Sequence, residues 1–217
     1  TVVTPSVSIA ASSSTICSGG SATFTATPTN GGSAPTYQWK LNGNNIIGTT
    51  GSSYTSSSFS NGDVVSVVMT SSAACYTSQT ATSNSVTMTV NQNLVPSVSI
   101  AASVNNICSG TPVTFTATPT NGGNAPIYQW KKNGSSITGA TASTYTSSVL
   151  ANNDVVSVVM TTSAACYTSQ TAVSNSVTMV VNTSLTPSVV VAASNTNVCA
   201  GTSVTFTATP TNGGATP

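Results

Sequence analysis

The chain has very few side chains that could perform acid–base chemistry. Asp63 and Asp154 are its only carboxylates, its cations are three lysines, and it contains no His, Glu or Arg. Catalysis by proton transfer needs titratable groups within reach of one substrate. The two carboxylates are 91 residues apart in equivalent positions, and each is expected to cap a turn or a strand end. Ser is abundant, but no His or Glu could activate it, so we expect no enzyme and no catalytic residues.

Metal and cofactor sites are equally short of ligands. Calcium sites that stiffen extracellular proteins use clustered carboxylates, and this sequence has only two in 217 residues. A structural zinc site needs four Cys or His ligands, and each repeat has only two Cys and no His. We therefore expect no metal site, no cofactor and no cofactor-binding residues.

The sequence is an internal repeat with a constant period. The string ICSG contains Cys17 and, 91 residues later, Cys108. The strings YQWK and SAACYTSQTA each recur after the same 91 residues. Cys199 continues the first series in the string VCAG. The repeat period is therefore 91 residues, with no insertion or deletion.

This period predicts the domain organisation. An immunoglobulin-type sandwich has about 100 residues, whereas solenoid and propeller units have about 20 to 50. The sequence therefore predicts one immunoglobulin-like repeat over residues 1–91 and a second over 92–182. Residues 183–217 match the first two strands of a third, truncated repeat. We interpret the chain as a window onto a longer array.

Composition and alternation predict an all-β fold. Roughly a third of the residues are Ser or Thr, well above ordinary usage, and Val, Ile, Thr, Tyr, Phe and Trp recur at alternate positions, as in strands. In the first repeat we expect a turn over residues 14–21 and a linker over 91–95. The expected strands cover residues 6–10, 22–27, 36–41, 63–70 and 85–90, with short strands near Ile46 and Tyr54.

A Trp on the third long strand is the signature of the predicted core. In immunoglobulin domains such a Trp packs on a disulfide between two strands, and alternation places Ala26 and Met69 at those two cysteine positions. We therefore expect Trp39 to pack against Ala26 and Met69. The predicted core residues are Trp39, Trp130, Phe24, Phe115, Met69 and Met160.

Two cysteines per repeat predict disulfides, provided that the protein is exported. In the immunoglobulin layout Cys17 and Cys75 lie in loops at opposite ends of a sandwich, whose strands span about 20 Å, too far for a disulfide. We therefore favour a bond between repeats, from Cys17 to Cys166. The main alternative, which needs another strand order, is Cys17–Cys75 with Cys108–Cys166. A Cys75–Cys108 bond or free thiols remain open as well.

The charge balance and the exposed residues limit the partners. A net charge of +1 is too small to bind nucleic acid or anionic lipid, and no apolar run reaches the about 18 residues of a membrane span. Tyr76 and Tyr167 are the best candidates for contact with a ligand, because an exposed Tyr offers a stacking face and a hydroxyl. A Thr series on one strand, Thr23, Thr25 and Thr27, is the other candidate surface, for ice or glycan.

The strings ICSGGSATFTATPTNGG, PTYQWKLNG, NGDVVSVVMTSSAAC and SNSVTMTV resemble a known family. They are similar to immunoglobulin or PKD-like repeats in giant surface proteins of Bacteroidota, among them gliding-motility adhesins and other type IX secretion cargo. This resemblance covers the whole repeat and implies a cell-surface or secreted filament, stalk or adhesin. It implies no catalytic residues.

The leading functional hypothesis is a structural segment of an extracellular filament or adhesin stalk, in gliding motility or attachment. Its partners would be neighbouring repeats of the same chain, surface polysaccharide or other adhesin chains. One alternative is a repeat that itself binds polysaccharide or ice. Another is an accessory array attached to a secreted enzyme.

Overall fold

The computed structural model describes residues 1–215, and these residues contain strands, turns and loops without a helix. Thr216 and Pro217, which close the predicted third segment, lie outside the described residues. Residues 1–97 form one compact unit together with 119–127 and 160–172, and residues 98–118, 128–159 and 173–217 form the other. The predicted all-β class is confirmed.

The first sheet of the first sandwich forms because small hydroxyl residues alternate with apolar ones. In its central strand Ala22, Phe24 and Ala26 are buried, whereas Thr25 and Thr27 are exposed, as the two-residue period of a strand requires. Both neighbouring strands pair with it in antiparallel register. In sheet order the strands are β1 (Ser6–Ala11), β3 (Ala22–Thr29) and β6 (Ser53–Ser56).

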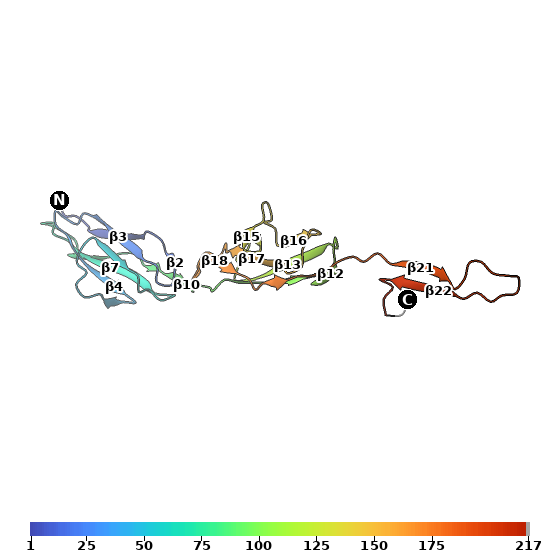
Figure 1. Ribbon diagram of the computed structural model, residues 1–217. Coiled ribbons are helices and arrows are strands. Elements are labelled where there is room, and N and C mark those ends of the chain that lie inside the picture. The colour runs from blue at the N-terminus through green and yellow to red at the C-terminus, as the bar shows by residue number, and fades with distance from the viewer. Residues whose placement is uncertain (216–217) are drawn as a thin grey trace. The chain divides into compact units, whose positions relative to one another are not determined.

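The second sheet is built around two long neighbouring strands, labelled β4 and β7 in Figure 1. Asn42 and Gly43 connect β4 to β5 with φ values of 52° and 80°, the left-handed pair that a two-residue hairpin needs. In sheet order the strands are β5 (Asn44–Asn45), β4 (Thr36–Leu41), β7 (Val64–Thr70) and β8 (Thr80–Thr82), with β9 (Val86–Thr87) also paired to β7.

A third pair of strands belongs to the first sandwich, and it shows that two sequence predictions were wrong. Residues 14–21 were expected to form a turn, but β2 (Thr15–Cys17) lies there and pairs in parallel with β10 (Thr89–Asn91). The strand expected over 85–90 is divided into β9 and β10. β2 and its partner β10 are far apart in sequence. Each strand has three residues, which are too few to show the alternating pattern that predicts a strand.

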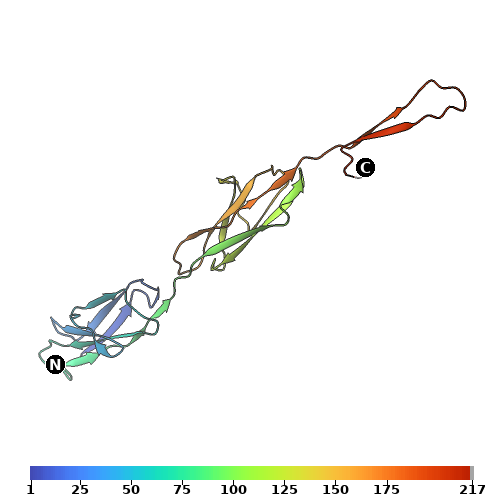
Figure 2. The ribbon, with the colours of Figure 1, turned by 60° about the horizontal axis from the view of Figure 1, so that its bottom comes forward.

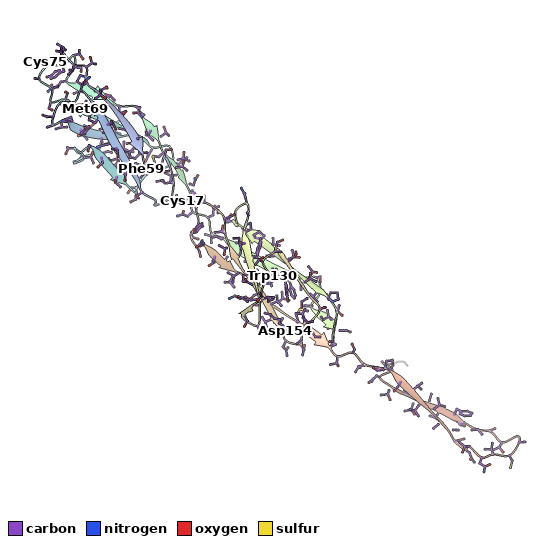
Figure 3. All side chains as sticks on the ribbon, turned by 90° about the horizontal axis from the view of Figure 1, so that it is seen from above. Cys17, Phe59, Met69, Cys75, Trp130 and Asp154 are labelled. Atoms are coloured by element: carbon purple, nitrogen blue, oxygen red, sulfur yellow. A yellow bond between two sulfur atoms is a disulfide. The ribbon has the colours of Figure 1, made fainter. Side chains whose placement is uncertain are left out.

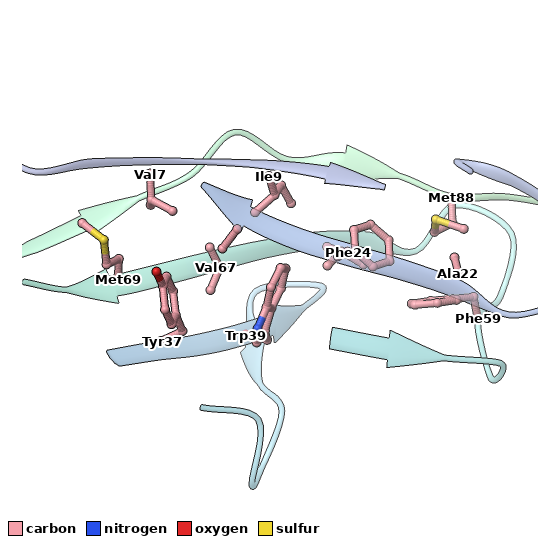
Figure 4. Close-up of a cluster of buried hydrophobic side chains, with 12 residues drawn as sticks. Val7, Ile9, Ala22, Phe24, Tyr37, Trp39, Phe59, Val67, Met69 and Met88 are labelled. Atoms are coloured by element: carbon pink, nitrogen blue, oxygen red, sulfur yellow. The ribbon is translucent and has the colours of Figure 1, made fainter. Parts of the chain in front are cut away.

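The core lies between the two sheets and is aromatic at its centre (Figure 4). Trp39 is fully buried, and its ring centroid lies 6.2 Å from that of Phe24 and 5.9 Å from that of Tyr54. Its indole N–H donates to the carbonyl of Gly51 at 2.9 Å. Met69 is also fully buried, but it stands opposite Tyr37, whereas Trp39 stands opposite Val67. Trp39 therefore packs on aromatic rings, and its expected contact with Met69, a diagonal neighbour on the paired strand, stays a prediction.

The second repeat has the same strand plan. Its Trp130, Phe115 and Met160 are fully buried. One sheet contains β11 (Ser97–Ala102), β13 (Val113–Thr120) and β16 (Thr144–Ser147). The other contains, in sheet order, β15 (Ser135–Ser136), β14 (Ile127–Lys132), β17 (Val155–Thr161) and β18 (Thr171–Val173), with β19 (Val177–Thr178) also paired to β17. The strand β12 (Asn106–Cys108) pairs in parallel with β20 (Val180–Asn182). Both repeats are immunoglobulin-like sandwiches.

The third segment is a two-stranded hairpin, drawn in red in Figure 2. Its strands are β21 (Ser188–Ala193) and β22 (Phe206–Thr211). Phe206 is 69% exposed and Val191 59%, whereas the equivalent Phe24 and Ile9 of the first repeat are 0% and 6% exposed. Among the described residues the hairpin therefore carries the core face of a sandwich without a facing sheet.

Replacing Trp39 with Ala should lower the unfolding free energy of the first sandwich by about 3–5 kcal/mol, because a fully buried aromatic side chain is lost from a packed core. Urea unfolding followed by circular dichroism measures the change. Ile47→Ala is the matched control, since Ile47 is 96% exposed, and it should change the free energy by less than about 0.5 kcal/mol. Equal effects of the two substitutions would contradict the core assignment.

Candidate functional site

The first sandwich presents Cys17 at the end of β2. Cys17 stands opposite Asn91 in the parallel pair of β2 with β10. The Ser18 N–H donates to the Asn91 carbonyl at 2.8 Å, and the Gly20 N–H donates to the Cys17 carbonyl at 2.8 Å. The short strand and the turn after it therefore fix the backbone on both sides of this cysteine.

Cys166 lies in the loop between β17 and β18, which a second segment holds in place. The Leu94 N–H donates to the Cys166 carbonyl at 3.1 Å, and the Thr168 N–H donates to the Leu94 carbonyl at 2.8 Å. Leu94 thus forms a parallel bridge with Tyr167. The linker expected over 91–95 is consequently shorter, because Asn91 belongs to β10 and Leu94 to this bridge.

A glycine in the loop between β13 and β14 permits the loop of Cys166 to approach it closely. Gly123 has a φ of +78°, and a Cβ there would lie 2.4 Å from the Ala164 nitrogen. The hydroxyl of Ser163 accepts from the Ala125 N–H at 2.9 Å, which joins the two loops. Gly32 makes the same close approach to Ala73 in the first repeat. In the first two repeats the second Gly of the Asn-Gly-Gly string is therefore required for this loop geometry.

A disulfide joins Cys17 to Cys166, with Cα atoms 5.4 Å apart and a sequence separation of 149. This is the pairing that the sequence favoured. The alternative, Cys17–Cys75 with Cys108–Cys166, is wrong, because Cys17 and Cys75 lie at opposite ends of the first sandwich (Figure 3) and Cys166 is bonded to Cys17. Cys75, Cys108 and Cys199 are free and exposed in the described part of the chain.

Asp63 is a structural residue that joins three segments. Its carboxylate accepts from the side-chain amide of Asn42 at 2.8 Å and from the Ser60 N–H at 2.8 Å. The Asn42 side-chain oxygen accepts in turn from the Val64 N–H at 2.9 Å, and the Asp63 carbonyl accepts from the Met88 N–H at 2.7 Å. Turn capping was the role expected from sequence, and each carboxylate oxygen accepts one of these hydrogen bonds.

Asp154 has the equivalent place in the second sandwich and gains an ion pair. Its carboxylate lies 3.3 Å from the ammonium of Lys132, at a position where the first repeat has Leu41. Burial by itself raises the pKa of Asp154, but hydrogen bonds from the Ala151 N–H and the Asn133 amide, together with Lys132, outweigh this effect and lower the pKa. The folded state therefore favours the charged carboxylate.

Asn84 connects the two sheets of the first sandwich, and no sequence prediction included it. Its side-chain oxygen accepts from the Ile9 N–H at 2.8 Å, and its amide donates to the Ile9 carbonyl at 3.1 Å. Asn175 binds Ile100 in the same way. The repeated string SNSV around each Asn was the available signal. An Asn side chain here takes the place of a neighbouring strand for β1 and β11.

The two surfaces singled out in the sequence are solvent-exposed. Tyr76 is 39% exposed and Tyr167 is 38% exposed, and each directly follows a loop cysteine. The Thr23 and Thr55 hydroxyls are 2.8 Å apart on neighbouring strands, and Thr25 and Thr27 continue the series outward. The structure brings the Tyr residues next to Cys75 and Cys166 and keeps the Thr series on the outer sheet face.

Two further observations concern ions and membranes. Among residues 1–215, no three or more His, Cys, Asp or Glu side chains are grouped so that they could hold a metal ion. The same residues include no helix long and apolar enough to cross a membrane.

No protein-family model matches the chain, and no curated protein matches it. Three N-terminal domains of the Highly Immunogenic Outer Capsid protein of bacteriophage RB49 are 16% identical over 95% of this chain and 69% of that chain, with a TM-score of 0.40. Murine CEACAM1b is 13% identical over 81% and 100%, with a TM-score of 0.38. Fibronectin(III)-like modules of CbhA from Clostridium thermocellum are 12% identical over 80% and 94%, with a TM-score of 0.34. Because these scores are low, the fold assignment depends on the strand pairings.

The lowered pKa of Asp154 gives an expected pH dependence. Its stabilising contribution is complete above the unfolded-state pKa, about 3.9, and is lost as the pH falls through the lower folded-state pKa. Asp154→Asn should therefore flatten the decrease of melting temperature between neutral pH and strong acid. Lys132→Leu, which copies the first repeat, should reduce this decrease less, since Asn133 and Ala151 still bind the carboxylate. An acid profile unchanged by Asp154→Asn would refute the assignment.

Proposed function

We propose that the chain is a non-catalytic structural segment of an extracellular array, in which consecutive sandwiches are stapled by disulfides. The finer proposal is a bacterial surface filament or adhesin stalk that serves attachment or gliding motility. Its repeats would position other domains of the protein away from the cell. The observation that carries this proposal is the Cys17–Cys166 disulfide between neighbouring repeats.

The disulfide supports an extracellular location. Such bonds persist in secreted and surface proteins and are rare in a reducing cytosol. A loop of 149 residues restricts the unfolded chain strongly, and the chain-entropy model gives about 5 kcal/mol of stabilisation for it. The cross-link therefore suits a protein that has few charges and no metal ligand cluster within residues 1–215.

The Cys17–Cys166 disulfide also changes the way in which the chain would bear load. Without it, the backbone around residues 92–93 is the one covalent connection between the two sandwiches, and one polar linker leaves hinge freedom. With it, a second covalent connection runs from Cys17 to Cys166. Force applied to the two ends of the chain then passes through the disulfide and not through the 149 residues of the loop. Resistance to extension is the property that a stalk needs.

A second candidate function is adhesion by the repeats themselves. The exposure of Tyr76 and Tyr167, at 39% and 38%, favours stacking on sugar rings. A polysaccharide that binds the native chain and no longer binds a Tyr76→Ala, Tyr167→Ala double variant would support this candidate. Equal retention of both proteins on a polysaccharide array would contradict adhesion through these Tyr residues, and the structural role would then be the sole candidate.

Single-molecule force spectroscopy tests the load path. In the oxidised chain, pulled from its two termini, unfolding should release no length from the residues between Cys17 and Cys166. Reductant should add about 500 Å of contour length, from 149 residues at about 3.3–3.6 Å each. Cys17→Ser should show this extra length without reductant. The matched control is Cys75→Ser, which removes a free cysteine and should behave as the native chain.

A Cys75→Ser chain that extends as far as Cys17→Ser, or an oxidised native chain that extends fully, would refute the load path. Labelling of intact producer cells tests the location. An antibody raised against the folded chain should bind the surface of intact cells, and binding only after lysis would contradict the extracellular proposal.

A further inference from the structure

The free cysteine Cys75 is held in the same local structure as the bonded Cys166. The Val3 N–H donates to the Cys75 carbonyl at 3.1 Å, and the Thr77 N–H donates to the Val3 carbonyl at 2.9 Å. These bonds repeat those of Leu94 with the Cys166 loop, at 3.1 and 2.8 Å. The local sequence SAACYTSQTA is identical in both. Cys75 therefore has the backbone frame of a disulfide-bonded residue and no bonded partner among the described residues.

Cys108 is likewise held in the local structure of the bonded Cys17. It stands opposite Asn182 in the parallel pair of β12 with β20, as Cys17 stands opposite Asn91. The Ser109 N–H donates to the Asn182 carbonyl at 3.0 Å, and the equivalent bond of Ser18 is 2.8 Å. Cys108 is also free and exposed in the described chain.

The two free residues are complementary halves of one connection. We call Cys17 and Cys108, at the ends of β2 and β12, the β2-type cysteines, and Cys75 and Cys166 the loop cysteines. The Cys17–Cys166 bond shows that one cysteine of each kind can form a disulfide. Each sandwich carries one cysteine of each kind at opposite ends, as Cys17 and Cys75 show (Figure 3). One sandwich therefore cannot close its own pair, and the contact is of the head-to-tail kind, which continues from unit to unit.

We infer that Cys75 and Cys108 are docking sites for further sandwiches of this same repeat type. Cys75 accepts the β2-type cysteine of a preceding sandwich, and Cys108 accepts the loop cysteine of a following one. This inference rests on the proposed function and names its partner. It also makes the repeat a connector with two different ends, so the bond pattern itself orders the units.

The bond forms by two thiol–disulfide exchanges with a small disulfide oxidant, such as oxidised glutathione. The thiolate of Cys75 attacks one sulfur of the oxidant, which releases one reduced thiol and leaves a mixed disulfide. The partner's thiolate then attacks the Cys75 sulfur of this mixed disulfide and releases the second reduced thiol. Two protein thiols are oxidised, and one oxidant disulfide is reduced to two thiols.

The test adds one repeat to the complete chain. A copy of residues 92–182 is placed directly before Thr1, which keeps the 91-residue register. The protein is refolded in a glutathione redox buffer, its free thiols are alkylated, and its peptides are mapped without reduction. We expect a new peptide that joins Cys75 to the Cys108 equivalent of the copy. Alkylation of Cys75 should fall to background, whereas the original Cys108 and Cys199, which gain no partner, should stay alkylated.

The matched control is the extended chain with Cys108→Ser in the copy alone, in which Cys75 should be alkylated again. The inference is overturned if Cys75 stays alkylated in the extended chain, or if it bonds glutathione or several cysteines at random. In either case a retained Cys17–Cys166 peptide would leave the proposed stapled segment standing. Loss of that peptide as well would refute both proposals.

Discussion

Each sandwich depends on the burial of an aromatic cluster between its two sheets. Phe24 on β3 and Trp39 on β4 have ring centroids 6.2 Å apart and no exposed surface, which fixes one sheet against the other. Burial of this kind supplies most of the free energy of a domain with so few ions. The packed sheets then hold β2 at one end and the loop of Cys75 at the other. The separation of the two cysteines is therefore a consequence of the core.

The near absence of charge means that neutral side chains provide the polar contacts. Asn84 takes the place of a strand for Ile9, and Asn42 joins the Asp63 turn to β7. Among the described residues no buried side-chain nitrogen or oxygen lacks a partner. Hydrogen bonds between neutral groups are little affected by ionic strength, in contrast to exposed ion pairs. A protein built in this way keeps these contacts at both low and high ionic strength.

Alternation was sufficient to predict the long strands, and β4 has the predicted bounds of 36–41. It was not sufficient for β2, because that strand has only three residues and its partner β10 lies more than 70 residues away in sequence. The Cys17–Cys166 pairing could be favoured from the distance between loops alone. The aromatic neighbours of Trp39, Phe24 and Tyr54, could not be deduced, because alternation gives the face of a residue and not its position along the strand.

Head-to-tail disulfides would also shorten the covalent path through every repeat. A path that enters the second sandwich through Cys166 and leaves through Cys108 covers a sequence separation of only 58, whereas the backbone period is 91 residues. At about 3.3–3.6 Å per residue, an unfolded repeat could then extend by about 200 Å in place of about 300 Å. The strands outside this path, β11, β12 and β18 to β20, would carry no load while the disulfides hold. Two cysteines per repeat can thus limit extension in a protein that uses neither charge networks nor clustered metal ligands within residues 1–215.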